Sequence, residues 1–215
     1  MKLCIPINQS KSQDVLLRLQ KAEKEADLVE IWFDEIIDLN ELNMLLIKKK
    51  SKKDLLYKVT KIDIAKIEQL LRTFENIKCI DFDVATDNNI LKNIKKKFPK
   101  IQLIISSHNF KKTPEKNELE SLAKTMFTKG ADIAKLVTTA NSLVDSLKML
   151  SFLSHLTKDG KKAICICMGE PGRLTRITGH LLGNYLMYAP LEEKDSTAPG
   201  QLTIKELKKI LKSNN

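Results

Sequence analysis

The sequence predicts an α/β fold and, within that class, a closed (β/α)8 barrel, the TIM barrel architecture. Short apolar runs alternate with amphipathic helical stretches from one end of the chain to the other. The runs are rich in Ile, Val and Leu, which is typical of parallel strands buried on both faces. The runs number eight and are evenly spaced, and these two features favour a barrel over an open sheet.

The apolar runs define the expected strands. They are Leu3–Ile7, Asp27–Phe33, Leu55–Val59, Cys79–Asp83, Gln102–Ser107, Ile133–Thr138, Lys162–Met168 and Asn184–Ala189. An open doubly wound sheet usually has a glycine-rich phosphate-binding turn after its first strand. Here that turn reads Ile7–Asn8–Gln9–Ser10 and contains no glycine.

Between the runs, apolar residues recur at helical spacing. The clearest helical segments are Gln13–Glu25, Ile62–Phe74, Glu118–Thr128, Ser142–Leu156 and Thr203–Leu211. No linker divides the 215 residues, so we expect a single domain over residues 1–215. The least regular segment, Leu191–Gln201, follows the last strand, where barrels place active-site loops.

Composition excludes several classes of protein. No apolar run approaches the ~18 residues of a transmembrane helix, and the N-terminus reads as a strand instead of a signal peptide. The net charge is +10, yet only four of the 37 basic residues are arginines and only 5% of residues are aromatic, which argues against a nucleic-acid surface. The four cysteines match no zinc or redox spacing and predict buried thiols in a reducing cytoplasm.

Two residues on expected strands could carry covalent and proton-transfer chemistry. Lys135 stands among Ile, Ala, Leu and Val, and burial should lower the pKa of its ammonium group. A neutral amine is what imine formation with a ketone requires, although a lysine here could instead extend to the rim or pair with a carboxylate. His108 ends its strand, where an imidazole is well placed for proton transfer. His155 and His180 fall in helical patterns and are expected to be structural.

Four more residues are candidates for substrate contacts. Glu30 lies amid apolar neighbours on the second strand and could orient a hydroxyl or form an ion pair. Arg176 follows the seventh strand and could bind a carboxylate through two hydrogen bonds. Thr197 and Gln201 offer a hydroxyl and an amide in the loop after the eighth strand.

In this order, these strings resemble one family, the type I 3-dehydroquinate dehydratases. The matching strings are ADLVEIW, SSHNF, ADIAK, MGEPGRLTR and TAPGQ, spread over nearly the whole chain. The resemblance implies a shikimate-pathway hydro-lyase that eliminates water from 3-dehydroquinate through a lysine imine. It implies Lys135 and His108 as catalytic residues and Glu30, Arg176, Thr197 and Gln201 as substrate-binding residues. It implies no metal and no cofactor. We expect no nucleic-acid or membrane partner, and a homodimer is the assembly to test.

Three positions depart from the family pattern. Trp32 and Thr60 stand where the family has arginines, and Ile64 stands near the family's histidine-partner glutamate. Their loss predicts reduced activity, because charge-assisted contacts and an orienting carboxylate are missing. Lys58 and Lys61 flank Thr60, and only one of the pair can face inward on a regular strand. Two alternatives stay open: an imine-forming lyase with a changed substrate, and a degenerate barrel that binds an anionic metabolite or a partner without turnover.

Overall fold

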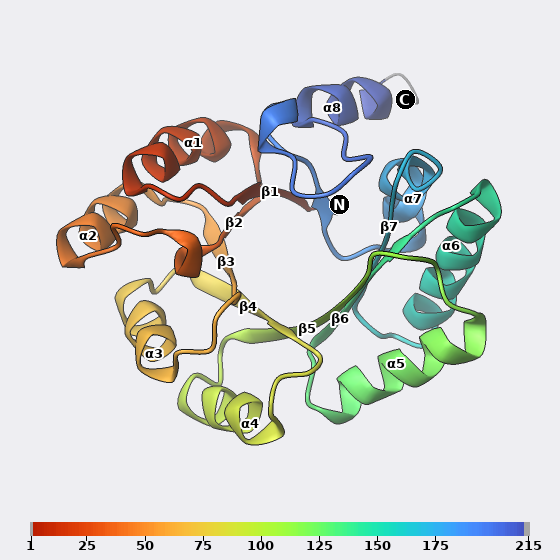
Figure 1. Cartoon of the computed structure of the whole chain (residues 1–215), viewed down its shortest axis with the longest axis horizontal. Helices are drawn as coiled ribbons and strands as arrows, with labels where there is room; N and C mark the ends of the chain where they lie inside the picture. The colour runs from red at the N-terminus through yellow and green to blue at the C-terminus, as the bar shows by residue number, and fades with distance from the viewer. Residues whose placement is uncertain (1, 213–215) are drawn as a thin grey trace.

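The computed structural model describes residues 2–212 and has eight parallel strands surrounded by helices (Figure 1). The strands are β1 Leu3–Ile7, β2 Leu28–Ile31, β3 Asp54–Lys58, β4 Ile77–Asp83, β5 Gln102–Asn109, β6 Ile133–Thr139, β7 Ala163–Met168 and β8 Met187–Tyr188. The α-helices are α1 Ser12–Glu25, α2 Glu41–Lys50, α3 Ile64–Thr73, α4 Asn88–Lys97, α5 Lys116–Thr128, α6 Leu143–Lys158, α7 Arg173–Thr178 and α8 Ile204–Lys212. Short 3-10 helices are η1 Phe33–Glu35, η2 Gly179–Leu182 and η3 Glu193–Asp195.

The strands form one sheet in the order β7-β6-β5-β4-β3-β2-β1-β8, with parallel pairing throughout. From β1 to β7, strands that are consecutive in the chain are therefore neighbours in space, β8 pairs with β1, and each connection carries a helix on the outside (Figure 1). The two ends of the order, β7 and β8, approach through the segment before β8. There the Tyr185 N–H donates to the Ala163 carbonyl at 2.8 Å, and the Cys165 N–H donates to Asn184 Oδ1 at 2.8 Å. The predicted barrel fold is confirmed.

Successive side chains of each strand point alternately to the outer face of the sheet and into the barrel, which divides the core into two regions. The larger region packs the outer face of the sheet against the helices, and the smaller one fills the barrel interior. The interior residues are Cys4, Leu28, Leu56, Cys79, Ile104, Ile133, Ile164, Ile166, Leu186 and Tyr188. Several of them lie near the N-terminal ends of their strands, so the next inward position along each strand lies closer to the carboxyl end.

That next inward position is polar in five strands. Two residues beyond Leu28, Leu56, Cys79, Ile104 and Ile133 stand Glu30, Lys58, Asp81, Ser106 and Lys135, all buried. The barrel interior therefore has an apolar layer near the N-terminal ends of the strands and a polar, mostly charged layer next to it on the carboxyl side. This layering, set by the two-residue period of the strands, positions the candidate site.

The expected strand positions agree with the structure to within a few residues, except at the eighth. The structure limits β8 to two residues, where the sequence predicted Asn184–Ala189. The Asn184 side chain instead accepts a hydrogen bond from the Cys165 N–H and donates one to the Leu186 carbonyl. The bond to Cys165 joins the segment before β8 to β7. Helices α2, α4 and α7 were not singled out by the sequence patterns.

Candidate active site

A cavity of about 210 Å³ opens at the carboxyl ends of the strands. All six residues predicted for the site line it, together with eight others. The full lining is Glu30, Trp32, Lys58, His108, Phe110, Lys135, Val137, Ile166, Met168, Arg176, Tyr188, Thr197, Ala198 and Gln201. The structure therefore brings together residues from β2, β3, β5, β6, β7, β8, α7 and the loop before α8.

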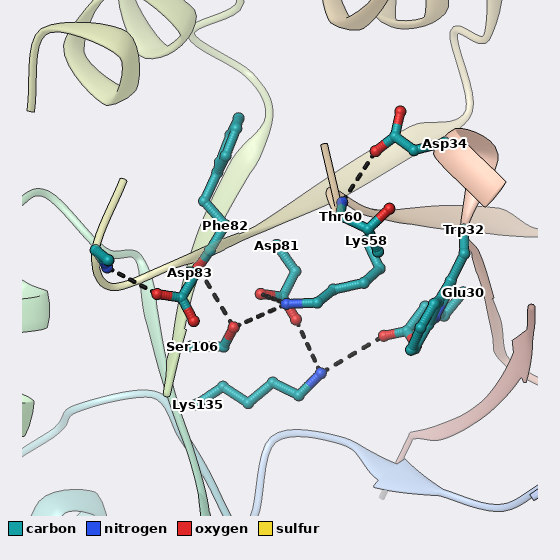
Figure 2. Close-up of polar contacts among 11 residues, drawn as sticks. Glu30, Trp32, Asp34, Lys58, Thr60, Asp81, Phe82, Asp83, Ser106 and Lys135 are labelled. Atoms are coloured by element: carbon teal, nitrogen blue, oxygen red, sulfur yellow. Dashed lines mark hydrogen bonds and ion pairs between the residues drawn. The ribbon is translucent and has the colours of Figure 1, made fainter. Parts of the chain in front are cut away.

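Lys135 lies at the centre of a buried ionic cluster (Figure 2). Its Nζ donates to Asp81 Oδ2 at 2.8 Å and lies 3.6 Å from Glu30 Oε2. The same ammonium group stands 4.5 Å from the centre of the Tyr188 ring, within the range of a cation–π contact. The resting lysine is thus an ion-paired ammonium surrounded by two carboxylates and an aromatic face.

The expected lowering of the Lys135 pKa is wrong. Burial by itself would lower this pKa, but the charges of Asp81 and Glu30 and the hydrogen bond to Asp81 outweigh burial. Together they raise the pKa of Lys135 above its usual range. The composition of one strand shows that a lysine is buried, but not which carboxylates face it from the neighbouring strands.

Asp81 is a member of the ionic cluster beside the cavity that the sequence patterns did not single out. It is fully buried on β4 and accepts one hydrogen bond from each of two lysines, Lys135 on Oδ2 and Lys58 on Oδ1 at 3.0 Å. Burial by itself would raise its pKa, but the two lysines lower the pKa of Asp81 below its usual range. A signal was available, because Asp81 interrupts an apolar strand just as Lys135 does.

Lys58 is the inward-facing member of the pair that flanks Thr60. Its Nζ reaches Asp81 and also lies 3.0 Å from Ser106 Oγ (Figure 2). Lys61, in contrast, is exposed and faces Glu35 at 3.8 Å. The expectation that only one of the two could face inward is met, and the inward one is Lys58.

His108 contributes a neutral imidazole to the cavity. Burial, the charge of Lys135 and the charge of Lys58 lower its pKa to about 4. Its ring stacks at 6.2 Å on the largely exposed ring of Phe110. Within residues 2–212 no hydrogen bond to the His108 imidazole is found, so no carboxylate orients it. At neutral pH this side chain can accept a proton.

Arg176 is the least satisfied cation of the cavity. It is buried on α7, and its Nε has no hydrogen-bond partner within the described chain. Burial lowers the pKa of Arg176 to about 10, so the guanidinium is still charged at neutral pH. A buried cation with a free N–H is costly unless a ligand pairs with it, and a carboxylate is the geometric match.

Trp32 faces the cavity from the end of β2. Its indole N–H donates to Glu30 Oε1 at 2.8 Å, while Glu30 Oε2 faces Lys135 at 3.6 Å. The indole thereby orients Glu30 by hydrogen bonding but adds no positive charge for a ligand.

The other two departures from the resemblance lie outside the cavity. Thr60 is exposed and bonds to Glu35 Oε1 at 2.6 Å and, through its N–H, to Asp34 Oδ2 at 2.9 Å. Ile64 is partly exposed at the start of α3. Neither side chain touches the cavity wall.

Thr197 and Gln201 belong to a tightly folded loop over the cavity. Gln201 Oε1 accepts from the Thr197 N–H at 2.7 Å, and Gln201 Nε2 donates back to Thr197 Oγ1 at 3.1 Å. The loop rests on the β7–α7 turn, where the Gly169 N–H donates to the Pro199 carbonyl. Gly200 has a φ of +75° and a side chain there would meet Gly169 O at 2.3 Å, so only glycine permits this approach.

Two structural features are absent from residues 2–212. No group of three or more His, Cys, Asp or Glu side chains is arranged to hold a metal ion. None of the helices in that range has the length and apolar character needed to cross a membrane.

Comparison with known proteins adds an independent result. The model of the family described as type I 3-dehydroquinase matches residues 3–215. A 3-dehydroquinate dehydratase of Methanococcus maripaludis strain C6 is 35% identical over 221 residues, covering 97% of this chain and 98% of that protein. The bifunctional 3-dehydroquinate dehydratase/shikimate dehydrogenase of Arabidopsis thaliana is 32% identical, covering 95% of this chain and 36% of that protein.

Solved structures give the same fold. The 3-dehydroquinate dehydratase of Geobacillus kaustophilus superposes with a TM-score of 0.84 at 22% identity, over 99% of this chain and 90% of that one. The type I enzyme of Clostridium difficile, solved with covalently modified comenic acid, superposes with a TM-score of 0.85 at 21% identity, over 99% of this chain and 91% of that one.

Proposed function

The chain belongs to the type I 3-dehydroquinase family, and on that premise we propose that it eliminates water from 3-dehydroquinate through an imine on Lys135. The observation that carries the proposal is the pairing, in one cavity, of a strand-borne lysine amine with an unpaired buried guanidinium. A ketone bearing a carboxylate is the kind of ligand that would use both groups. The proposed reaction makes the protein a carbon–oxygen lyase of the shikimate pathway.

The first half of the reaction joins the substrate to the enzyme. Lys135 loses a proton, and its neutral amine attacks the ketone carbon to give a carbinolamine. This intermediate loses water and becomes a protonated imine, which draws electrons from the neighbouring carbon. Asp81 and Glu30, which pair with the ammonium group at rest, also stabilise the positive charge of the imine.

The second half is the elimination. His108 takes a proton from the carbon beside the imine, and the electron pair forms an enamine. The enamine collapses and expels the hydroxyl group, which takes a proton from His108 and leaves as water. Water then hydrolyses the protonated imine, which releases 3-dehydroshikimate and returns Lys135 to its resting ammonium form. The water lost in forming the imine is returned here, so the net change is the loss of one water from the substrate.

The remaining cavity residues would bind the substrate. Arg176 would pair with the substrate carboxylate, because it is a cation of the cavity whose buried Nε–H has no hydrogen-bond partner in the described chain. Glu30 would accept from a substrate hydroxyl in addition to Trp32. Thr197 and Gln201 already close a loop by their mutual hydrogen bonds, and that loop would cover the bound ring.

We propose that the activity is lower than the family pattern would allow. Trp32 supplies an N–H but no charge, Thr60 and Ile64 lie outside the cavity, and no carboxylate bonds to His108 in the described chain. A base that is poorly oriented and has a pKa of about 4 abstracts a proton slowly. The four buried, unpaired cysteines fit a reducing cytoplasm, and a homodimer is the assembly to test by light scattering.

The deciding experiment combines a steady-state assay with covalent trapping. Dehydroshikimate formation is followed by the absorbance of its conjugated enone, and borohydride is added to a parallel sample to reduce the imine. We expect an adduct that peptide mapping places on Lys135. Lys135→Met should remove both signals, whereas Lys124→Met, on the exposed face of α5, should leave both unchanged. An unmodified wild-type Lys135 at saturating substrate would rule out the imine mechanism and leave a binding protein without turnover.

A further inference from the structure

Lys58 lines the cavity but takes no part in the reaction steps proposed above. Its ammonium group is 3.0 Å from Asp81 Oδ1 and 3.0 Å from Ser106 Oγ, and its side chain is almost fully buried. Figure 2 shows Lys58 and Lys135 approaching Asp81 from opposite sides. Each carboxylate oxygen of Asp81 is therefore paired with a different lysine.

In the proposed reaction, one of these two lysines, Lys135, loses its positive charge in several intermediate states. Lys135 is positively charged at rest and as the protonated imine, but it is uncharged as the free amine, the carbinolamine and the enamine. In each uncharged state Asp81 loses the charge of its partner on Oδ2. A fully buried carboxylate without a cation is strongly disfavoured. The uncharged states of Lys135 are therefore accessible only if another cation stays beside Asp81.

We infer that Lys58 is this permanent cation: a positioning residue that keeps Asp81 ionised and in place while Lys135 passes through its uncharged states. The inference rests on the proposed imine function and deepens it. Lys58 acts through Asp81, with no bond to the reacting carbons. It also explains why a second buried lysine is tolerated here, because Asp81 and Ser106 satisfy it.

The other groups around Lys135 give no substitute for Lys58. Glu30 from β2 is a second carboxylate and increases the need for a cation. Burial raises the pKa of Cys4 on β1 and of Tyr188 on β8, so both are uncharged at neutral pH. His108 from β5 is neutral there as well. Arg176 lines the cavity but makes no ion pair within the described residues, and the proposed function assigns it to the substrate.

Competitive acetylation tests the inference without any substrate. Trace acetic anhydride reacts with neutral amines, so the labelling of Lys135 at pH 8, relative to exposed Lys124, reports how much of Lys135 is uncharged. Removing the charge of Lys58 leaves Lys135 as the sole cation on Asp81. In Lys58→Met we therefore expect labelling of Lys135 to fall about tenfold, the equivalent of one pKa unit.

Three further variants separate charge from structure. Lys58→Gln removes the charge but keeps an N–H donor for Asp81 and Ser106, so labelling of Lys135 should fall about tenfold in this variant too. It provides the test if the methionine variant does not fold. Lys58→Arg keeps the charge and should label as wild type. Lys61→Met removes the exposed neighbouring lysine and should change nothing. In Lys58→Met with Asp81→Asn, where the carboxylate is gone too, labelling should recover above that of Lys58→Met.

The outcomes distinguish this inference from the proposed function. Unchanged or increased labelling of Lys135 in Lys58→Gln would overturn the role of Lys58, whether or not wild type forms an adduct with substrate. A wild-type protein that labels as expected but gives no borohydride adduct would overturn the imine reaction alone. Where both hold, the rate of adduct formation in Lys58→Gln should fall by the same factor as the labelling.

Discussion

Lys135 and Asp81 meet inside the barrel although β5 lies between their strands, with Nζ 2.8 Å from Oδ2. The contact forms because inward side chains on alternate strands of a barrel point at the same layer. The contact holds the Lys135 amine in its protonated form, so the proposed imine reaction requires Lys135 to lose a proton first. That relationship determines how the proposed activity should depend on pH.

The rate of imine formation should rise with pH. Asp81 and Glu30 raise the pKa of Lys135, so below that pKa the neutral fraction grows about tenfold for each pH unit. His108, with a pKa of about 4, is neutral throughout this range and adds no inflection. We expect borohydride trapping at limiting substrate to accelerate steadily from pH 6 to pH 9. A plateau beginning near pH 7 would contradict the raised pKa.

Arg176→Met should weaken substrate binding. It removes the unpaired buried guanidinium, and a charge-assisted hydrogen bond is worth ~1.5–3 kcal/mol, or about 10- to 100-fold in kcat/KM. The matched control is Arg173→Met on the same helix, where the guanidinium is more exposed and pairs with Glu170. Equal kinetic losses in the two variants would show that the helix, and not the cavity charge, was disturbed.

Trp32→Arg should raise dehydratase activity. The indole lines the cavity and bonds to Glu30, so an arginine there would keep an N–H for Glu30 and add a charge beside the substrate. We expect about a tenfold gain in kcat/KM, the lower end of a charge-assisted contact. Thr60→Arg alone should have no effect, because Thr60 points at Glu35 on the surface. A gain that required both arginines would instead place the Thr60 position within reach of the substrate.

Asp81→Asn should destabilise the protein. It leaves two buried lysines without their shared carboxylate, and breaking a buried ion pair in this way costs ~3–5 kcal/mol. The lowered pKa of Asp81 means that its stabilisation is fully present above its unfolded pKa of about 4 and is lost as pH falls through the lower folded value. Urea denaturation at pH 7 should show the loss.

The control for that measurement is Asp83→Asn. Asp83 is exposed two residues along the same strand and accepts from the Ala85 N–H, which asparagine can also do. Its free energy of unfolding should stay within about 0.5 kcal/mol of wild type. An equally stable Asp81→Asn variant would mean that water already reaches the buried cluster.

The fold could be predicted from the sequence because it follows from patterns among residues that are close together in the chain. Apolar runs of strand length, separated by helical periodicity, leave few arrangements other than parallel strands covered by helices. The positions of Lys135 within the sixth strand, of His108 near the end of the fifth and of Arg176 after the seventh followed from the same pattern. The eighth strand was overestimated, because Asn184 forms hydrogen bonds with β7 that no local pattern reveals.

The protonation of the site was decided by tertiary structure alone. The sequence shows that Lys135 is buried, and burial by itself lowers an ammonium pKa. Only the closed barrel brings Asp81 from β4 and Glu30 from β2 to the amine, where two negative charges reverse the shift. Periodicity along one strand tells which face a residue takes, whereas the charge that it meets there comes from strands distant in sequence. That is the physical reason why the sequence could predict a buried lysine at this position, whereas only the structure determined its protonation state.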